Sequence, residues 1–300
     1  MRGVVAAALV AIAVALGPAP PAAATHPEGL PNWPTLLPPR PNDPDRLRLT
    51  FDVCPQGDRG CPAKVIAEMY KRWRPLDRKC DHRAVFALTY LRTTEEFART
   101  VKADPGFFAD PRWVNNEDAV FAELYFRAYD RYVAGRKVPS AWRIAFEAAA
   151  SPDVTGAGDL LLGMNAHINR DLPYTLAHVG LTRKKGKSRK PDHDKVNEFL
   201  ERVADPLQEE LARRYDPMFD VSDGGPSPFD ELAVLQAVRG YRENAWRNAE
   251  NLIAARDDPD QLALVRDSIE HEAEAQALAI RAANTVPGYG ATRDAHCQAR

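Results

Sequence analysis

Apolar residues recur at helical spacing along most of the chain from Cys61 onward. Val120, Leu124 and Ala128, for example, stand four residues apart. Residues three and four apart share one face of an α-helix, and no stretch of useful length alternates apolar and polar residues as a half-buried strand would. With 45% hydrophobic residues, the chain can bury a substantial core. The pattern therefore predicts an all-α fold, a single compact multi-helix bundle over residues 61–300.

Prolines mark the segment that precedes this helical domain. Residues 25–60 contain eight prolines, and proline both removes a backbone donor and disfavours helix in the residue before it. We expect residues 25–60 to form a proline-rich N-terminal arm of extended chain. Within the helical domain, Asp205-Pro206 is expected to interrupt a helix that ends near Tyr215, and Asn115 or Asn116 is expected to cap another.

The first 24 residues have the pattern of a secretory signal peptide. A positive charge at Arg2 precedes the apolar run from Val4 to Leu16, and Ala22 and Ala24 form a small-x-small cleavage site. The apolar run is too short to span a bilayer, which needs roughly 20 residues. We expect cleavage of residues 1–24 to leave a secreted, extracellular chain without a transmembrane segment; an uncleaved anchor is the alternative.

The chain has four cysteines, all after the expected cleavage site. An even number of cysteines in an exported chain favours two disulfides over metal ligation. Four cysteines allow three pairings. We favour Cys54 with Cys61, which closes a small loop, and Cys80 with Cys297, which ties the C-terminal tail to the body. A zinc site is the weaker interpretation because the sequence has no C-x-x-C pair.

Polar side chains crowd one otherwise apolar helix, between Gly163 and Pro173. At helical spacing, Met164 and Ile168 belong to a core stripe that also contains Leu161 and Leu172. His167 and Asp171 lie at one edge of that stripe, and Asn165 and Asn169 lie on its other side. A carboxylate that faces the core must be paired, hydrogen-bonded or bound to a metal, because an isolated buried charge is too costly.

His167 and Asp171 are the candidate catalytic residues. Their i, i+4 spacing lets both side chains reach one point, which suits two ligands of a divalent metal, zinc first among them. The same spacing suits a general-base pair in which the carboxylate orients the imidazole. His178, Asp192 and His193 could complete the metal ligands. A buried polar network that only locks helices together is an equally good explanation of the pattern.

Several other residues are expected to support this site rather than react. They are Asn165, Asn169, Arg170, Asn197 and Trp246, the last as a wall of the same cavity. Asp118 and Glu123 rank lower because they lie five apart on an apolar helix and do not share a face. The basic loop of residues 183–190 could attract an anionic ligand, although such a run is more often a solvated loop.

Other function classes lack their usual support in this sequence. The 40 basic and 42 acidic residues give a net charge of −2, which argues against specific nucleic-acid binding. The sequence has no G-x-S-x-G elbow, no phosphate-binding glycine loop before a helix and no H-E-x-x-H. Serine hydrolases, nucleotide-binding proteins and zincins are therefore not indicated.

The run Gly163-Met164-Asn165-Ala166-His167-Ile168-Asn169-Arg170-Asp171-Leu172-Pro173 resembles the signature of a bacterial, mainly actinobacterial, family of domains of unknown function. Further matching pieces surround Phe86-Ala87-Leu88, Ala141-Trp142-Arg143 and Ala245-Trp246-Arg247. The resemblance covers nearly all of the chain after residue 24. It implies an all-α fold with a shared polar centre and no particular activity.

A fainter similarity is to the all-α zinc-dependent phospholipase C and single-strand nuclease group. The metal-binding helix of that group also carries H-x-x-x-D followed by a proline and another histidine, as His167, Asp171, Pro173 and His178 do here. The N-terminal tryptophan of the mature group is absent, because Thr25 or His26 takes its place. The similarity implies one or two bound metals rather than a trinuclear zinc cluster.

Together these observations lead to one leading hypothesis and two alternatives. The leading hypothesis is a secreted, metal-dependent hydrolase that acts on an ester or phosphoester of a small-molecule or lipid-like substrate through His167 and Asp171. The first alternative is a non-catalytic exported protein that binds a small or lipid-like molecule, with Trp246 and Tyr174 lining its cavity. The second is a purely structural buried network.

Overall fold

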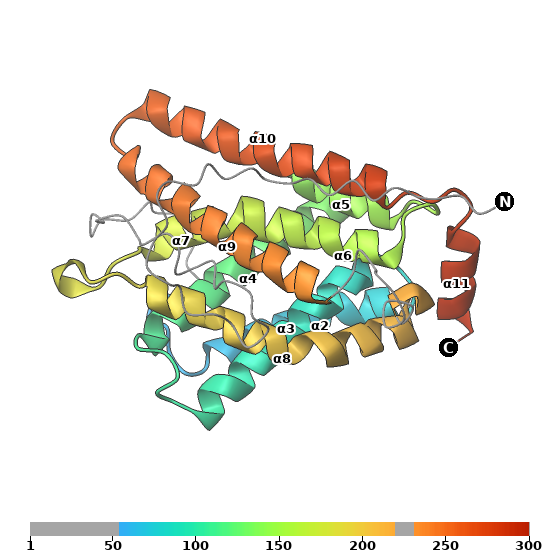
Figure 1. Cartoon of the computed structure of the whole chain (residues 1–300), viewed down its shortest axis with the longest axis horizontal. Coiled ribbons are helices and arrows are strands. Elements are labelled where there is room, and N and C mark those ends of the chain that lie inside the picture. The colour runs from blue at the N-terminus through green and yellow to red at the C-terminus, as the bar shows by residue number, and fades with distance from the viewer. Residues whose placement is uncertain (1–53, 220–230, 300) are drawn as a thin grey trace.

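One long helical segment runs through the centre of the molecule, and the other helices pack around it (Figure 1). The computed structural model describes residues 54–219 and 231–299. The central segment consists of α6 (Gly156–Met164), the π-helical turn η1 (Asn165–Asp171) and α7 (Leu172–Val179). Its only interruption is a change of helix type, so a single rod carries the whole polar motif.

The remaining described elements are also helical. They are α2 (Cys61–Asp77), α3 (Arg83–Ala103), α4 (Pro111–Val133), α5 (Ser140–Ala149), the 3-10 turn η2 (Lys184–Gly186), α8 (Lys190–Arg214), α9 (Glu231–Ala254), α10 (Pro259–Ala283) and α11 (Gly290–Gln298). The described residues form isolated β-bridges and no strand. The predicted all-α bundle is confirmed. The expected signal peptide, residues 1–24, and most of the arm, residues 25–60, lie outside the described residues.

Helix starts follow the chemistry of the residues that precede them. The Asp110 side chain accepts a hydrogen bond from the Trp113 N–H, and Pro111 occupies the first turn of α4. Asp258 and Pro259 start α10 in the same way. The expected cap at Asn115 or Asn116 is wrong, because the Asp-Pro pair starts the helix one turn earlier and leaves both asparagines buried inside it.

Proline does not break α8 as the sequence suggested. The helix continues from Lys190 to Arg214 with Pro206 inside it. Asp205 and Pro206 are both exposed, so water can hydrate the backbone carbonyl that loses its partner. A lost hydrogen bond on a wet helix face costs less than one in the core, and the helix tolerates it.

The central segment contacts a different set of helices along its length. α6 packs against α3, α5 and α10, η1 packs against α4, α5, α9 and α10, and α7 packs against α4 and α9. Gly163 allows the closest of these approaches, because a Cβ at that position would lie 2.4 Å from the Phe86 ring. The glycine therefore brings α3 close to the polar motif.

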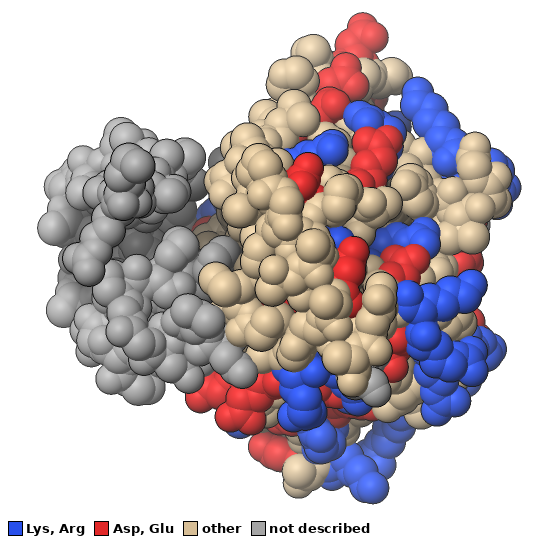
Figure 2. Space-filling view, turned by 90° about the vertical axis from the view of Figure 1, so that its right-hand side faces the viewer, with Lys and Arg blue, Asp and Glu red and all other residues tan. Residues whose placement is uncertain are grey.

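The face of the bundle that Figure 2 shows carries both basic and acidic side chains, with basic ones gathered toward the right-hand and lower edges and a broad uncharged area beside them. Among the described helices, none is both long enough and apolar enough to cross a membrane.

Two disulfides close the fold, in the predicted pairing. Cys54 bonds to Cys61, and Cys80 bonds to Cys297 with a Cα–Cα separation of 5.9 Å. The second bridge fastens α11 to the start of α3. Polar contacts support it there: His82 Nε2 lies 3.2 Å from Asp294 Oδ1, and Arg293 lies 3.8 Å from Asp159.

The two disulfides should contribute unequally to stability. They join residues 217 and 7 apart in sequence, so the chain-entropy relation predicts losses of roughly 5 kcal/mol for Cys80→Ser/Cys297→Ser and roughly 2.5 kcal/mol for Cys54→Ser/Cys61→Ser. Urea denaturation of both double variants measures the difference. Equal losses would show that loop length does not set the contribution of these bridges.

Candidate functional site

The polar motif forms a π-helical turn, the widest type of helix turn. The Leu172 N–H donates to the His167 carbonyl five residues earlier, instead of to the carbonyl four residues earlier. Such turns are rare and occur frequently at functional sites. Here the wide turn holds His167 and Asp171 on one side of the rod and Asn165 and Asn169 on another.

Aromatic rings and one carboxylate hold the His167 imidazole. Its Nδ1 lies 3.3 Å from Asp171 Oδ2. The ring stacks on Phe121 at a centroid distance of 3.5 Å with an interplanar angle of 5° and meets Tyr90 edge-on at 4.4 Å. These contacts confirm the predicted closeness of His167 and Asp171. They also restrict the imidazole to one orientation.

Asp171 is fully buried and accepts hydrogen bonds from several donors. Trp142 Nε1 donates to its Oδ2 at 2.9 Å, and Arg170 Nη1 donates to its Oδ1 at 2.8 Å. Arg170 also donates to Glu270 on α10 at 2.8 Å. The contact with Asp171 Oδ2 favours a proton on His167 Nδ1.

The second ring nitrogen of His167 therefore acts as an acceptor. Nε2 is buried and has no hydrogen-bond partner in the part of the chain that the structure describes. Burial lowers the pKa of His167 below its ordinary value, and the hydrogen bond to Asp171 only partly opposes this effect. At neutral pH the imidazole is uncharged and Nε2 carries a free lone pair.

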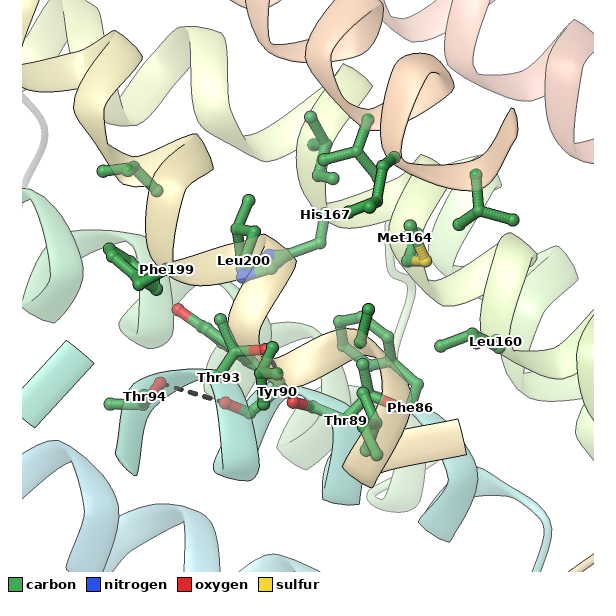
Figure 3. A pocket seen from close by; sticks show the side chains of 18 of the residues that line it. Phe86, Thr89, Tyr90, Thr93, Thr94, Leu160, Met164, His167, Phe199 and Leu200 are labelled. Carbon is green, nitrogen blue, oxygen red and sulfur yellow. Dashed lines mark hydrogen bonds between the residues drawn. The ribbon is translucent and has the colours of Figure 1, made fainter. Parts of the chain in front are cut away.

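His167 faces a cavity of about 240 Å³ between α3, α4, α6, α8 and α9. Figure 3 shows His167 and Met164 on the central segment facing Phe86 and Tyr90 on α3. The walls are mainly apolar and include Phe86, Leu160, Met164, Phe199, Leu200 and Val238. Leu161, Met164 and Ile168, expected as packed core, are instead half-buried residues that line this cavity, whereas Leu172 is buried as expected.

Two adjacent acids on α4, Glu117 and Asp118, also line the cavity. Glu117 Oε2 and Asp118 Oδ2 are buried without hydrogen-bond partners. Burial is the main cause that raises the pKa of Glu117 to about 7 and that of Asp118 to about 8. Sequence reasoning ranked Asp118 low and missed Glu117. Two consecutive acids in an apolar helix were the available signal.

Arg242 on α9 connects the predicted His193 to the same cavity. Arg242 lines the cavity and donates through Nη2 to the His193 carbonyl at 2.6 Å. His193 Nδ1 lies 3.6 Å from Glu117 Oε1, and burial lowers the pKa of His193 well below its ordinary value. His193 thus lies behind Glu117 and Arg242, outside the set of lining residues.

The other predicted metal ligands lie elsewhere. Asp192 accepts hydrogen bonds from the N–H groups of Ala109 and Asp110, each at 2.8 Å, and from Arg183 at 2.7 Å. His178 is buried on α7 and does not line the cavity.

The described residues therefore do not assemble the predicted ligand set. Among them, one group of three His, Cys, Asp or Glu ligand atoms lies within 4.8 Å of one another, Cys54, Asp58 and Cys61, and its two cysteines form a disulfide. The structure brings together His167 and Asp171 alone. Most of their remaining hydrogen-bonding capacity goes to the protein.

The residues predicted to support the site have distinct positions. Asn165 donates to the Ala273 carbonyl at 2.8 Å, and Asn169 donates to Asn165 Oδ1 at 2.9 Å and to Gln276 at 2.8 Å. Both asparagines thus fasten η1 to α10.

The expected cavity walls Trp246 and Tyr174 do not line the cavity, and neither does Asn197. Trp246 Nε1 donates to Glu250 Oε1 at 3.0 Å, and its ring lies 5.2 Å from that of His193.

Part of the basic loop, residues 183–190, is neutralised by the body of the protein. Arg189 lies 3.1 Å from Asp110, and Lys190 is buried between Asp194 at 2.9 Å and Glu243 at 2.8 Å. None of the loop residues lines the cavity. The loop therefore fixes the start of α8 and does not contribute charge to the cavity walls.

Comparison with known proteins identifies a family without an activity. No curated protein and no solved structure shows a significant match to the chain. A family model described as "Family of unknown function (DUF5995)" matches residues 63–283, which include the central segment and every cavity wall described above. The chain therefore belongs to this family of unknown function.

Proposed function

We propose that this protein is a hydrolase that cleaves an ester bond of a small, mainly apolar molecule held in the cavity. One observation carries the proposal: the two nitrogens of the buried His167 have different surroundings. Nδ1 lies against the Asp171 carboxylate, while Nε2 has no hydrogen-bond partner among the described residues, and His167 lines the cavity. A carboxylate-oriented imidazole of this kind is the usual arrangement of a general base.

In the proposed reaction, His167 Nε2 takes a proton from a water molecule as the water oxygen attacks the carbonyl carbon. The π electrons of the carbonyl move onto its oxygen. When they re-form the double bond, the ester C–O bond breaks, and the leaving alcohol takes the proton back from His167. Asp171 stabilises the imidazolium between these two proton transfers. The products are one carboxylic acid and one alcohol.

The walls favour a carboxylic ester over the phosphoester that the sequence also allowed. An anionic phosphate would lose its hydration in an apolar cavity and would lie near Glu117, whose pKa of about 7 leaves it partly ionised at neutral pH. Arg242, the cationic residue of the lining, already donates to the His193 carbonyl. A neutral ester avoids both costs.

A divalent metal and export from the cell stay predictions from sequence. The fit of a metal is poor, because the described residues supply His167 and Asp171 without a third ligand within reach. No step of the proposed reaction is therefore assigned to a metal. Metal analysis of the purified protein and sequencing of its mature N-terminus test these two predictions directly.

The apolar cavity also supports a second candidate, a non-catalytic protein that binds a small or lipid-like molecule. Most of its walls are aliphatic or aromatic side chains, as in many small-molecule binding sites. This candidate requires a bound ligand but no turnover. It is preferred if the protein binds apolar esters and leaves them intact.

Replacing His167 by Gln should abolish most of the activity and leave the fold intact. We expect at least about a 100-fold loss of kcat/KM on p-nitrophenyl esters of short fatty acids, since general-base catalysis contributes 10²–10⁴-fold. His178→Gln is the matched control, because His178 is buried on the same rod but does not line the cavity. Equal activity per folded molecule in both variants would contradict the role of His167.

Asp171→Ala should instead unfold the site. We expect it to lower the free energy of unfolding by about 3–5 kcal/mol, because it removes the acceptor of buried Trp142 Nε1 and of Arg170 Nη1 and breaks the contact with His167. Glu147→Ala, which removes an exposed pair with Arg143, should cost about 0.5 kcal/mol or less. If His167→Gln destabilises the protein as much as Asp171→Ala does, the purely structural interpretation of the motif is correct.

The pH profile should show an acid limb that belongs to His167. Because burial lowers the pKa of His167, the imidazole stays neutral and active until the pH falls below this pKa. We therefore expect kcat/KM to stay level at neutral pH and to fall with a midpoint below the ordinary value of 6.5. The residual activity of His167→Gln should lack this limb. A midpoint above 6.5 would contradict the assignment.

A further inference from the structure

Tyr90 and Asp118 bring two further polar groups to the cavity beside His167. Tyr90 on α3 and Asp118 on α4 both line it. Among the described residues, the Tyr90 oxygen and Asp118 Oδ2 are both buried without hydrogen-bond partners. The Tyr90 ring centroid lies 4.4 Å from that of His167. Unpaired polar atoms in an apolar wall are costly, so their presence calls for a ligand atom that pairs with them.

Both groups carry a proton at neutral pH. Burial, with a contribution from Glu117, raises the pKa of Asp118 to about 8, so its carboxyl is mostly neutral at pH 7. Burial also raises the pKa of the Tyr90 hydroxyl, and Asp118, Asp171 and Glu117 raise it further. Protonated carboxyl and hydroxyl groups are hydrogen-bond donors. The residues that line the cavity thus include two groups that can donate, together with His167.

We propose that Tyr90 and Asp118 bind one oxygen atom of the ligand between them, the carbonyl oxygen of an ester or the hydroxyl oxygen of a phenol-like molecule. The catalytic meaning of this pair rests on the proposed hydrolase function, because the donors would stabilise the negative charge that develops on the carbonyl oxygen during attack. A tyrosine and a neutral carboxylic acid in an apolar site can act in this way. Binding of the oxygen does not depend on catalysis.

Cavity size limits the rest of the ligand. A cavity of about 150 Å³ lined by apolar side chains holds benzene, so 240 Å³ suits a somewhat larger apolar body, such as a bicyclic aromatic. The apolar walls offer this body no hydrogen-bond partners. The inferred ligand is therefore an apolar ring or short chain with one oxygen at the end that faces Tyr90, Asp118 and His167.

Other titratable or cationic groups around the cavity are few among the described residues. They are Glu117 on α4, His167 on η1 and Arg242 on α9, while α6 and α8 contribute uncharged side chains. The positive charge of Arg242 lowers the pKa of Glu117 and partly opposes the effect of burial. Asp118 has no such counter-charge, so its protonation should control binding of the ligand oxygen above neutral pH.

Fluorescence titration with 2-naphthol tests the proposal, with 2-methylnaphthalene as the ligand of equal shape that lacks the oxygen. We expect the full-length protein to bind 2-naphthol at least tenfold more tightly at pH 6.5. Tyr90→Phe and Asp118→Leu should each weaken 2-naphthol binding by about tenfold, as for one lost hydrogen bond of about 1.4 kcal/mol, and leave 2-methylnaphthalene binding unchanged. Between pH 6.5 and 8.5 the preference should fall in the wild type and stay constant in Asp118→Leu.

Thr93→Val is the matched control for the two variants. Thr93 also lines the cavity on α3, but its hydroxyl already donates to the Thr89 carbonyl at 2.9 Å, so this variant should keep the preference for 2-naphthol. Equal affinity of the wild type for the two ligands, failure of both to bind, or an unchanged preference in both Tyr90→Phe and Asp118→Leu would overturn the proposal. A preference for 2-naphthol in a protein without esterase activity would support the donor pair and reject the hydrolase function.

Discussion

The buried carboxylate of Asp171 is the constraint on which the centre of this bundle depends. A fully buried charge is tolerated only where donors surround it, and here they come from α5 through Trp142 and from the rod itself through Arg170 and His167. Arg170 extends the network to α10 through Glu270. One side chain therefore fixes the relative positions of three helical elements and the orientation of the imidazole. The π-helical turn is consistent with this demand, because the wider turn holds His167 and Asp171 together inside an otherwise regular rod.

The cavity results from the way in which the bundle packs around that rod. Half-buried apolar residues of the central segment, such as Met164 and Ile168, face α3, α8 and α9 without filling the space between them. Helices in a tightly packed core would close this space, since interiors normally leave few voids larger than a water molecule. An apolar void of about 240 Å³ forfeits packing contacts. A ligand of matching shape would restore them, which links the packing of the fold to the proposed function.

Local sequence rules predicted the parts of the structure that depend on neighbours in the chain. The helical class, the contact of His167 with Asp171 and the position of Asn165 and Asn169 away from it follow from residue spacing within one helix. The disulfide pairing was the favoured one of three that four cysteines allow. Asp118 was ranked low because it does not share a helix face with Glu123, and Glu117 was not considered. Because α4 is capped at Asp110, Glu117 and Asp118 lie in the interior of the helix, where α4 lines the cavity together with α8 and α9. Residue spacing within one helix cannot predict which other helices lie across a cavity from it.

Paired and unpaired polar atoms both occur at this centre. A network that only locks helices together would satisfy most of its members, since nearly all buried polar groups in proteins have partners. Among the inner atoms, both Asp171 oxygens and Asn169 Nδ2 are bonded, while Asn169 Oδ1 has no hydrogen-bond partner among the described residues. In three residues that line the cavity, His167 Nε2, the Tyr90 hydroxyl and Asp118 Oδ2 likewise have no partner in the described part of the chain. Each unpaired group costs about 1–3 kcal/mol, so a ligand that pairs with these three groups would recover part of that cost. Under the proposed function, the inner network is the support that holds the lining residues in place for such a ligand.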